Sequence, residues 1–114
     1  MDNDTSLQAL EDEIFDKVKR LTSRANLLEQ TAKNQEKTYN SYQQQSTTNQ
    51  DPEYKDKSIS LANLMVQNLT EALSAATEIN ELMTSIKLPA KVYLDNIERM
   101  TSLLKNAEDL LSQP

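Results

Sequence analysis

Apolar residues recur at alternating steps of three and four along residues 62–111. If a heptad is lettered a to g, the a and d positions of this stretch are all apolar. Such a repeat over this length predicts a long helix in a coiled coil or a helical bundle. The a positions are Ala62, Leu69, Ala76, Met83, Ala90, Ile97, Leu104 and Leu111, and the d positions are Met65, Ala72, Ile79, Ile86, Tyr93, Met100 and Ala107.

The N-terminal part of the chain carries a second apolar stripe with helical spacing. Thr5 followed by Gln8 fits a capping box, which places a helix start near Thr5. We predict a one-faced amphipathic helix at about residues 5–38. Its stripe consists of Leu7, Leu10, Ile14, Val18, Leu21, Ala25, Leu28 and Ala32.

Basic side chains lie to one side of this first stripe, at Lys17, Arg20 and Arg24. They could form a docking patch for an acidic partner. Acidic residues stand one turn before two of them, at Glu13 and Asp16, in the orientation that favours ion pairs within a helix. We therefore interpret this side as a solvated face with ion pairs.

Residues 33–53 contain no Leu, Ile, Val, Met, Phe or Ala, and the large apolar groups are Tyr39 and Tyr42. The Gln-rich part of this stretch cannot bury enough surface to offset the entropy of ordering. We predict a mobile polar linker at about residues 40–51 that packs against nothing. A contact or aggregation role for the Gln-rich part is the alternative.

A second helix start follows at Asp51, Pro52 and Glu53, because Asp suits the N-cap, Pro the first helical position and Glu the first turn. We predict a helix at about residues 52–87. Its apolar face between Ile59 and Ile86 covers more than half of the circumference, which is wider than one partner helix can bury. A third helix or another chain must cover the surplus.

Pro89 lies inside the heptad repeat and should kink or break the helix there, because proline lacks an N–H donor and pushes Leu88 away from helical geometry. We predict a last helix at about residues 89–112. The heptad keeps its phase across Pro89, which favours a kink, although a full reversal of the chain stays open.

These elements predict an all-α fold: a long antiparallel helical hairpin plus a C-terminal helix after a Pro kink, forming one domain over residues 1–114. We expect the chain to be part of a hetero-oligomeric helical bundle or coiled coil. The expected partner-binding residues are Leu61, Met65, Leu69, Ala72, Leu73, Ala76, Ile79, Met83, Ile86, Tyr93, Ile97, Met100, Leu104 and Leu111.

The composition argues against catalysis. The 114 residues include no Cys, His or Gly, which removes thiol and imidazole chemistry, the usual zinc ligands and phosphate-binding glycine loops. Carboxylate pairs such as Asp95 and Glu98 are ordinary on helix surfaces, and Met65, Met83 and Met100 have the spacing of core residues. We predict no enzymatic activity, no catalytic or metal-binding residues, no cofactor and no small-molecule substrate.

The net charge of −6 disfavours direct nucleic-acid binding. The sequence has no signal-peptide pattern and no apolar run long enough to cross a membrane, so we expect neither secretion nor membrane insertion. A soluble protein of the cytoplasm or nucleus is expected.

Two other kinds of coiled-coil protein deserve comparison. A SNARE helix carries Gln or Arg in the middle of its apolar layers, whereas no a or d position of residues 62–111 is polar. A tethering, kinetochore or cytoskeletal subunit has no such distinguishing feature, so it stays an alternative.

The layout resembles the surfeit-locus-five family of small Mediator head-module subunits. The resemblance covers most of residues 10–111 and rests on residues 27–33 (LLEQTAK), 60–66 (SLANLMV) and 79–83 (INELM), followed by a Pro and a further helix. Residues 7–12 (LQALED) are also similar to the opening of the small head subunit with which that family pairs.

The resemblance implies a nuclear, non-enzymatic subunit of a transcriptional coactivator that links regulators to RNA polymerase II. It implies that the N-terminal hairpin pairs with one small hairpin subunit in a four-helix bundle, and that the last helix binds a larger scaffold subunit.

Overall fold

The computed structural model describes residues 2–49 and 52–112, which form three helices and contain no strand. They are α1 (Asp2–Asn49), α2 (Pro52–Ser85) and α3 (Lys91–Ser112). The prediction of an all-α fold is confirmed. The longest dimension is 72 Å, and a helix with the 48 residues of α1 has a length of about 72 Å. The first helix therefore spans the whole molecule.

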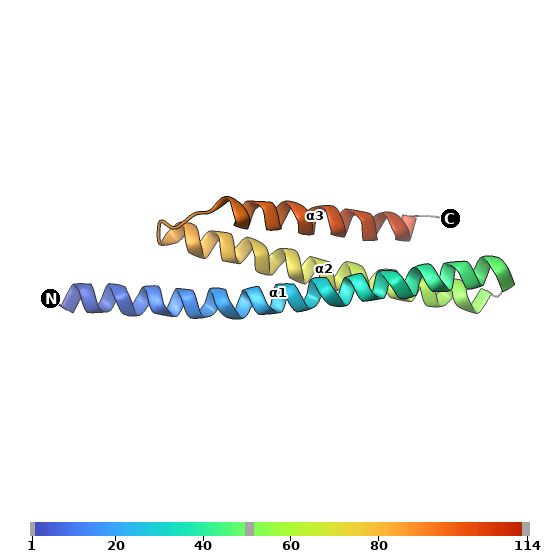
Figure 1. Ribbon diagram of the computed structural model, residues 1–114, viewed down its shortest axis with the longest axis horizontal. Helices are drawn as coiled ribbons and strands as arrows, with labels where there is room; N and C mark the ends of the chain where they lie inside the picture. Colours follow the sequence, from blue (N-terminus) through green and yellow to red (C-terminus); the bar gives the residue numbers. More distant parts are fainter. Residues whose placement is uncertain (1, 50–51, 113–114) are drawn as a thin grey trace.

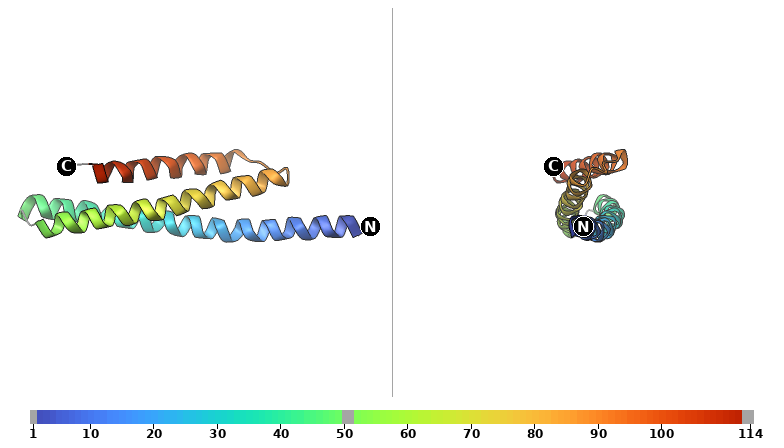
Figure 2. Two further views of the ribbon diagram at one scale, coloured as in Figure 1. Left: turned by 180° about the vertical axis from the view of Figure 1, so that it is seen from behind. Right: turned by 90° about the vertical axis from the view of Figure 1, so that its left-hand side faces the viewer.

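The helices lie side by side with their axes nearly aligned (Figures 1 and 2). Helices α1 and α2 form an antiparallel hairpin, and α3 returns along α2 in the direction of α1 (Figure 1). Helix α2 packs closely against both neighbours along its length, whereas the backbones of α1 and α3 come close to each other at few points. The end view in Figure 2 shows α2 between α1 and α3.

The face of α1 that packs on α2 follows a heptad along most of the helix. Its buried members are Ala25, Ala32 and Tyr39, each one heptad apart. The partly buried positions between and around them continue the alternating steps, and they are Ile14, Val18, Leu21, Leu28, Gln35, Tyr42 and Ser46. The repeat therefore continues well beyond Ala32, although its later members are polar or aromatic.

The predicted polar linker at residues 40–51 is wrong over its described part, because α1 continues to Asn49. Tyr42 packs on Tyr54 of α2, with ring centroids 5.8 Å apart. The Nζ atom of Lys57 lies 5.8 Å from the Tyr42 ring centroid. Gln43 donates a hydrogen bond of 3.0 Å to the Tyr39 hydroxyl. These contacts, together with the good helix propensity of Gln, hold the tract in a helix.

A proline at Ser41 distinguishes a helix from a linker. In the helix, Ser41→Pro removes a backbone hydrogen bond and crowds the preceding turn, which costs about 3 kcal/mol. Ser41→Ala, at the same exposed site, should be neutral or slightly stabilising. Urea unfolding of both variants measures the difference. Equal stability of the two variants would restore the linker interpretation.

The a and d positions of residues 62–83 in α2 are all buried, although Ser58 and Ala75, which lie outside them, are buried as well. Ala62, Met65, Leu69, Ala72, Ala76, Ile79 and Met83 are all buried. One core cluster joins Met65 and Leu69 to Ala32 of α1 and Ala107 of α3. A second cluster joins Ala72 and Ala76 to Met100 of α3, with Leu28 of α1 packed against it. All three helices therefore share one continuous core.

Helix α3 covers much of the surplus apolar face of α2. Val66 packs with Leu103 and Leu104 against the first cluster, and Leu73 packs with Ile97 against the second. A third helix or another chain was expected to cover this face. In the structure a third helix of the same chain, α3, covers much of it.

A C-terminal motif that normally uses glycine reverses the chain between α2 and α3. The Leu88 amide donates to the Met83 carbonyl at 2.8 Å, and the Lys87 amide to the Thr84 carbonyl at 3.0 Å. This is the Schellman pattern, and Lys87 adopts its left-handed conformation with φ of 63°. Pro89 then prevents the helix from continuing. The sequence left a kink or a reversal open at Pro89, and the chain reverses (Figure 1).

Candidate protein-interaction site

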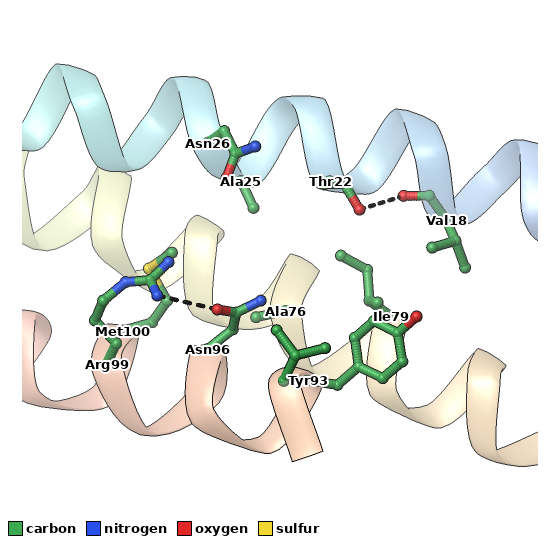
Figure 3. Close-up of a pocket in the computed structure, with 11 residues that line it drawn as sticks. Val18, Thr22, Ala25, Asn26, Ala76, Ile79, Tyr93, Asn96, Arg99 and Met100 are labelled. Atoms are coloured by element: carbon green, nitrogen blue, oxygen red, sulfur yellow. Dashed lines mark hydrogen bonds between the residues drawn. The ribbon is translucent and has the colours of Figure 1, made fainter. Parts of the chain in front are cut away.

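A groove of about 320 Å³ lies where the three helices diverge (Figure 3). Val18, Thr22, Ala25 and Asn26 come from α1, and Tyr93, Asn96, Arg99 and Met100 come from α3 (Figure 3). Ala76 and Ile79 of α2 lie between these two walls, and Val92 completes the lining. For brevity we call this site the three-helix groove.

The three-helix groove has an apolar base and a more polar rim. Ala25, Ala76, Ile79 and Met100 are buried and form this base. Thr22, Asn26 and Val92 are exposed at the opening. The Thr22 hydroxyl is engaged by its own helix, since it donates to the Val18 carbonyl at 2.8 Å. The groove therefore offers apolar surface flanked by amide side chains.

One ion pair joins α1 to α3 beside the groove. Arg99 donates two hydrogen bonds to the carboxylate of Glu29, from Nε to Oε2 at 2.8 Å and from Nη2 to Oε1 at 3.1 Å. Lys33 lies 3.7 Å from the same carboxylate, and Arg99 also donates to Asn96 at 3.0 Å. Glu29 is buried, so this two-point contact compensates the loss of its hydration.

The same geometry changes the acidity of both groups. Hydrogen bonding from Arg99 is the main cause that lowers the pKa of Glu29 below its ordinary value of 4.5. Burial opposes this shift, and the charges of Arg99 and Lys33 reinforce it. Hydrogen bonding to Glu29 raises the pKa of Arg99. Glu29 therefore stabilises the folded chain in its charged form.

The lowered pKa of Glu29 predicts a pH dependence of stability. Because the folded pKa lies below the unfolded one, the contribution is complete above pH 4.5 and disappears as the pH falls through the folded value. Urea unfolding should show wild type more stable than Glu29→Gln at neutral pH, with a smaller difference in acid. A difference that is independent of pH would contradict this role of the ion pair.

The structure divides the predicted partner-binding residues by burial. Met65, Leu69, Ala72, Ala76, Ile79, Met83 and Met100 are buried inside the chain. Leu61, Leu73, Ile86, Tyr93, Ile97 and Leu104 are partly buried, and Leu111 is exposed. Ala76, Ile79, Tyr93 and Met100 come together at the three-helix groove. In this arrangement most of the predicted partner-binding residues pack inside the chain itself.

The predicted partner-binding residues include Ile97, Met100 and Leu104 of α3. In the structure, these three side chains pack in or against the core clusters shared with α2. Val92 and Leu94 of the same helix are exposed.

Sequence reasoning missed most of the exposed apolar side chains. None of Phe15, Leu27, Ile59, Leu64, Leu88, Val92 and Leu94 was among the predicted partner-binding residues, and all are exposed. Those within residues 62–111 share one feature of the sequence: they are large and apolar but lie outside the a and d positions, as Leu64 and Leu94 do. The groove residues Thr22, Asn26, Asn96 and Arg99 carry no signal in the hydrophobic pattern.

The basic side chains of α1 form ion pairs on the surface. Lys17 lies 3.0 Å from Glu78, and Arg24 lies 2.8 Å from Glu71, so both pairs connect α1 to α2. Arg20 pairs with Asp16 one turn earlier at 3.5 Å. The interpretation as a solvated face with ion pairs is confirmed for Arg20 with Asp16, whereas Lys17 pairs with Glu78 of α2 and not with Glu13. Exposed pairs of this kind each contribute about 0–1 kcal/mol.

Residues 2–49 and 52–112 contain no cluster of carboxylates suited to hold a metal ion. None of their three helices is long and apolar enough to cross a membrane.

Comparison with known proteins gives no significant match to a protein family, a curated protein or a solved structure. The resemblance to the surfeit-locus-five family therefore stays a prediction.

Proposed function

We propose that the chain is a non-catalytic structural subunit of a multiprotein assembly, which it joins by accepting a helix of a partner. The three-helix groove carries this proposal. Helices α1 and α3 flank α2 and their backbones come close at few points, although the Glu29–Arg99 ion pair joins them beside the groove. A fourth helix laid between α1 and α3 would complete a four-helix bundle.

The lining of the groove supports a helix as its occupant. Ala25 and Ala76 are small and buried at its base, so a partner helix can approach closely. Asn26 and Asn96 flank the opening, where they can pair with polar side chains of the partner. The occupant that fits is an amphipathic helix with one narrow apolar stripe and polar flanks.

We further propose that the assembly is the head module of the nuclear Mediator coactivator, which links regulators to RNA polymerase II. The support is the resemblance carried by residues 27–33, 60–66 and 79–83. On this proposal the partner helix belongs to the small hairpin subunit with which the family pairs.

Two substitutions on α3 test the groove. Val92 is 54% exposed and lines it, whereas Leu94 is 57% exposed and does not. The tagged chain is purified from its source cell, the partner is identified, and binding is then measured with the purified partner. Val92→Asp should weaken binding at least about tenfold, and Leu94→Asp should leave it nearly unchanged.

Equal binding by both variants would refute the groove as the docking site. The identity of the partner tests the assembly separately: Mediator subunits support the coactivator, whereas vesicle proteins indicate a SNARE or tethering complex. Microtubule or centromere proteins indicate a cytoskeletal or kinetochore complex.

A further inference from the structure

A second apolar surface lies at the N-terminal end of α1, away from the three-helix groove. Helix α1 extends beyond the turn between α2 and α3 (Figures 1 and 2). There, Leu7 and Leu10 are 58% and 51% exposed. With Glu11 of α1, Ser85 at the end of α2, and Ile86 and Lys87 of the turn, they line a hollow of about 280 Å³. We call this the terminal hollow.

The net charge of the chain is concentrated on the segment that holds this hollow. The sequence has 18 acidic and 12 basic residues, and the six acidic residues that precede Lys17 equal the whole excess. Glu11 lines the hollow, and Asp12 and Glu13 follow it with exposed side chains. Among the side chains described, none of these three carboxylates has an ion-pair partner.

The combination restricts the chemistry of an occupant. Leu7, Leu10 and Ile86 favour an apolar side chain in the hollow. The carboxylate of Glu11 favours Lys or Arg beside the hollow, and the exposed carboxylates of Asp12 and Glu13 nearby add to the negative charge of this segment. Lys87 lies on the turn side of the lining, so the attraction for cations is strongest toward α1.

We propose that the terminal hollow binds a basic amphipathic segment of a partner protein, with an apolar residue in the hollow and Lys or Arg facing Glu11. This surface is separate from the three-helix groove, and the proposal stands independently of what the groove binds.

A synthetic probe tests this proposal. The probe is an amphipathic helical peptide of roughly 20 residues with a Leu stripe flanked by Lys, and its twin carries Glu in place of Lys. The full chain should bind the Lys peptide and not the Glu twin. Raising the salt from about 50 mM to about 500 mM should weaken binding several-fold, because screening acts on exposed charges.

Matched variants locate the binding site. Glu11→Lys with Asp12→Lys should weaken binding of the Lys peptide at least about tenfold, whereas Glu108→Lys with Asp109→Lys, which changes the net charge equally, should change it less than about twofold. Leu10→Ser should weaken binding, whereas Leu27→Ser, at another exposed site on α1, should not.

Three results would overturn the proposal: equal loss with both charge pairs, full binding by Leu10→Ser, or loss of binding with Val92→Asp. The first indicates attraction to net charge alone, the second an unused hollow, and the third a peptide in the three-helix groove. Circular dichroism checks that each variant keeps its helices, which we expect because these side chains are exposed or, at Glu11, only partly buried.

Discussion

Leu69→Asp should unfold the whole chain. Leu69 is 2% exposed and packs in one cluster with Ala32 of α1 and Ala107 of α3. A carboxylate at this site has no partner for its charge, and the lost apolar contacts involve all three helices. We expect a cost above about 4 kcal/mol, which is most of the stability that a domain of this size ordinarily has.

Far-UV circular dichroism and urea unfolding measure this loss. Leu64→Asp is the matched control, since Leu64 lies on the same helix and is 44% exposed. It should keep the helical spectrum with little change in the unfolding midpoint. A folded, cooperatively unfolding Leu69→Asp chain would show that the core is assigned wrongly. Ile79→Asp should behave like Leu69→Asp, because Ile79 is also buried.

The second large effect concerns α3. Met100 is 1% exposed and packs against Ala72 and Ala76 of α2, with Leu28 of α1 also against this cluster. Met100→Ala leaves a cavity between the helices, and such a change costs about 2–5 kcal/mol. Because the clusters link α3 to the hairpin, we expect one unfolding transition at a lower urea midpoint, with the slope unchanged.

Leu94→Ala provides the comparison within α3. Because Leu94 is exposed, this substitution should lower the free energy of unfolding by no more than about 0.5 kcal/mol. Similar costs for Met100→Ala and Leu94→Ala would mean that α3 does not pack on the hairpin in solution. Two separate transitions would mean that α3 and the hairpin unfold independently.

The sequence predicts which residues are buried better than it predicts which element covers them. The heptad correctly marks Met65, Leu69 and Ile79 as buried, because apolar side chains leave water whatever covers them. It carries no information on whether the cover is another chain or α3. Whether α3 supplies the cover depends on the chain reversal at Lys87. Lys87 adopts the left-handed conformation that glycine ordinarily occupies, so no glycine in the sequence signals this turn.

The end of α1 was missed for a related reason. Tyr39, Tyr42 and Ser46 continue the heptad after Ala32, so a signal was present. Its members are aromatic or polar, and a search for aliphatic residues passes over them. The hydrophobic pattern also cannot reveal the ion pair beside the groove, since Glu29 and Arg99 lie 70 residues apart. Only the folded topology brings these two side chains together.

The claim that a partner helix occupies the three-helix groove is tested most directly by site-specific cross-linking in the assembled complex. The chain has no Cys, so Asn96→Cys places one photoactivatable probe in the groove, and Glu98→Cys places it outside. The groove probe should cross-link to residues of one partner chain at helical spacing, and the outer probe should not. A complex that forms without cross-links from Asn96→Cys, or with the same cross-links from both sites, would contradict the account.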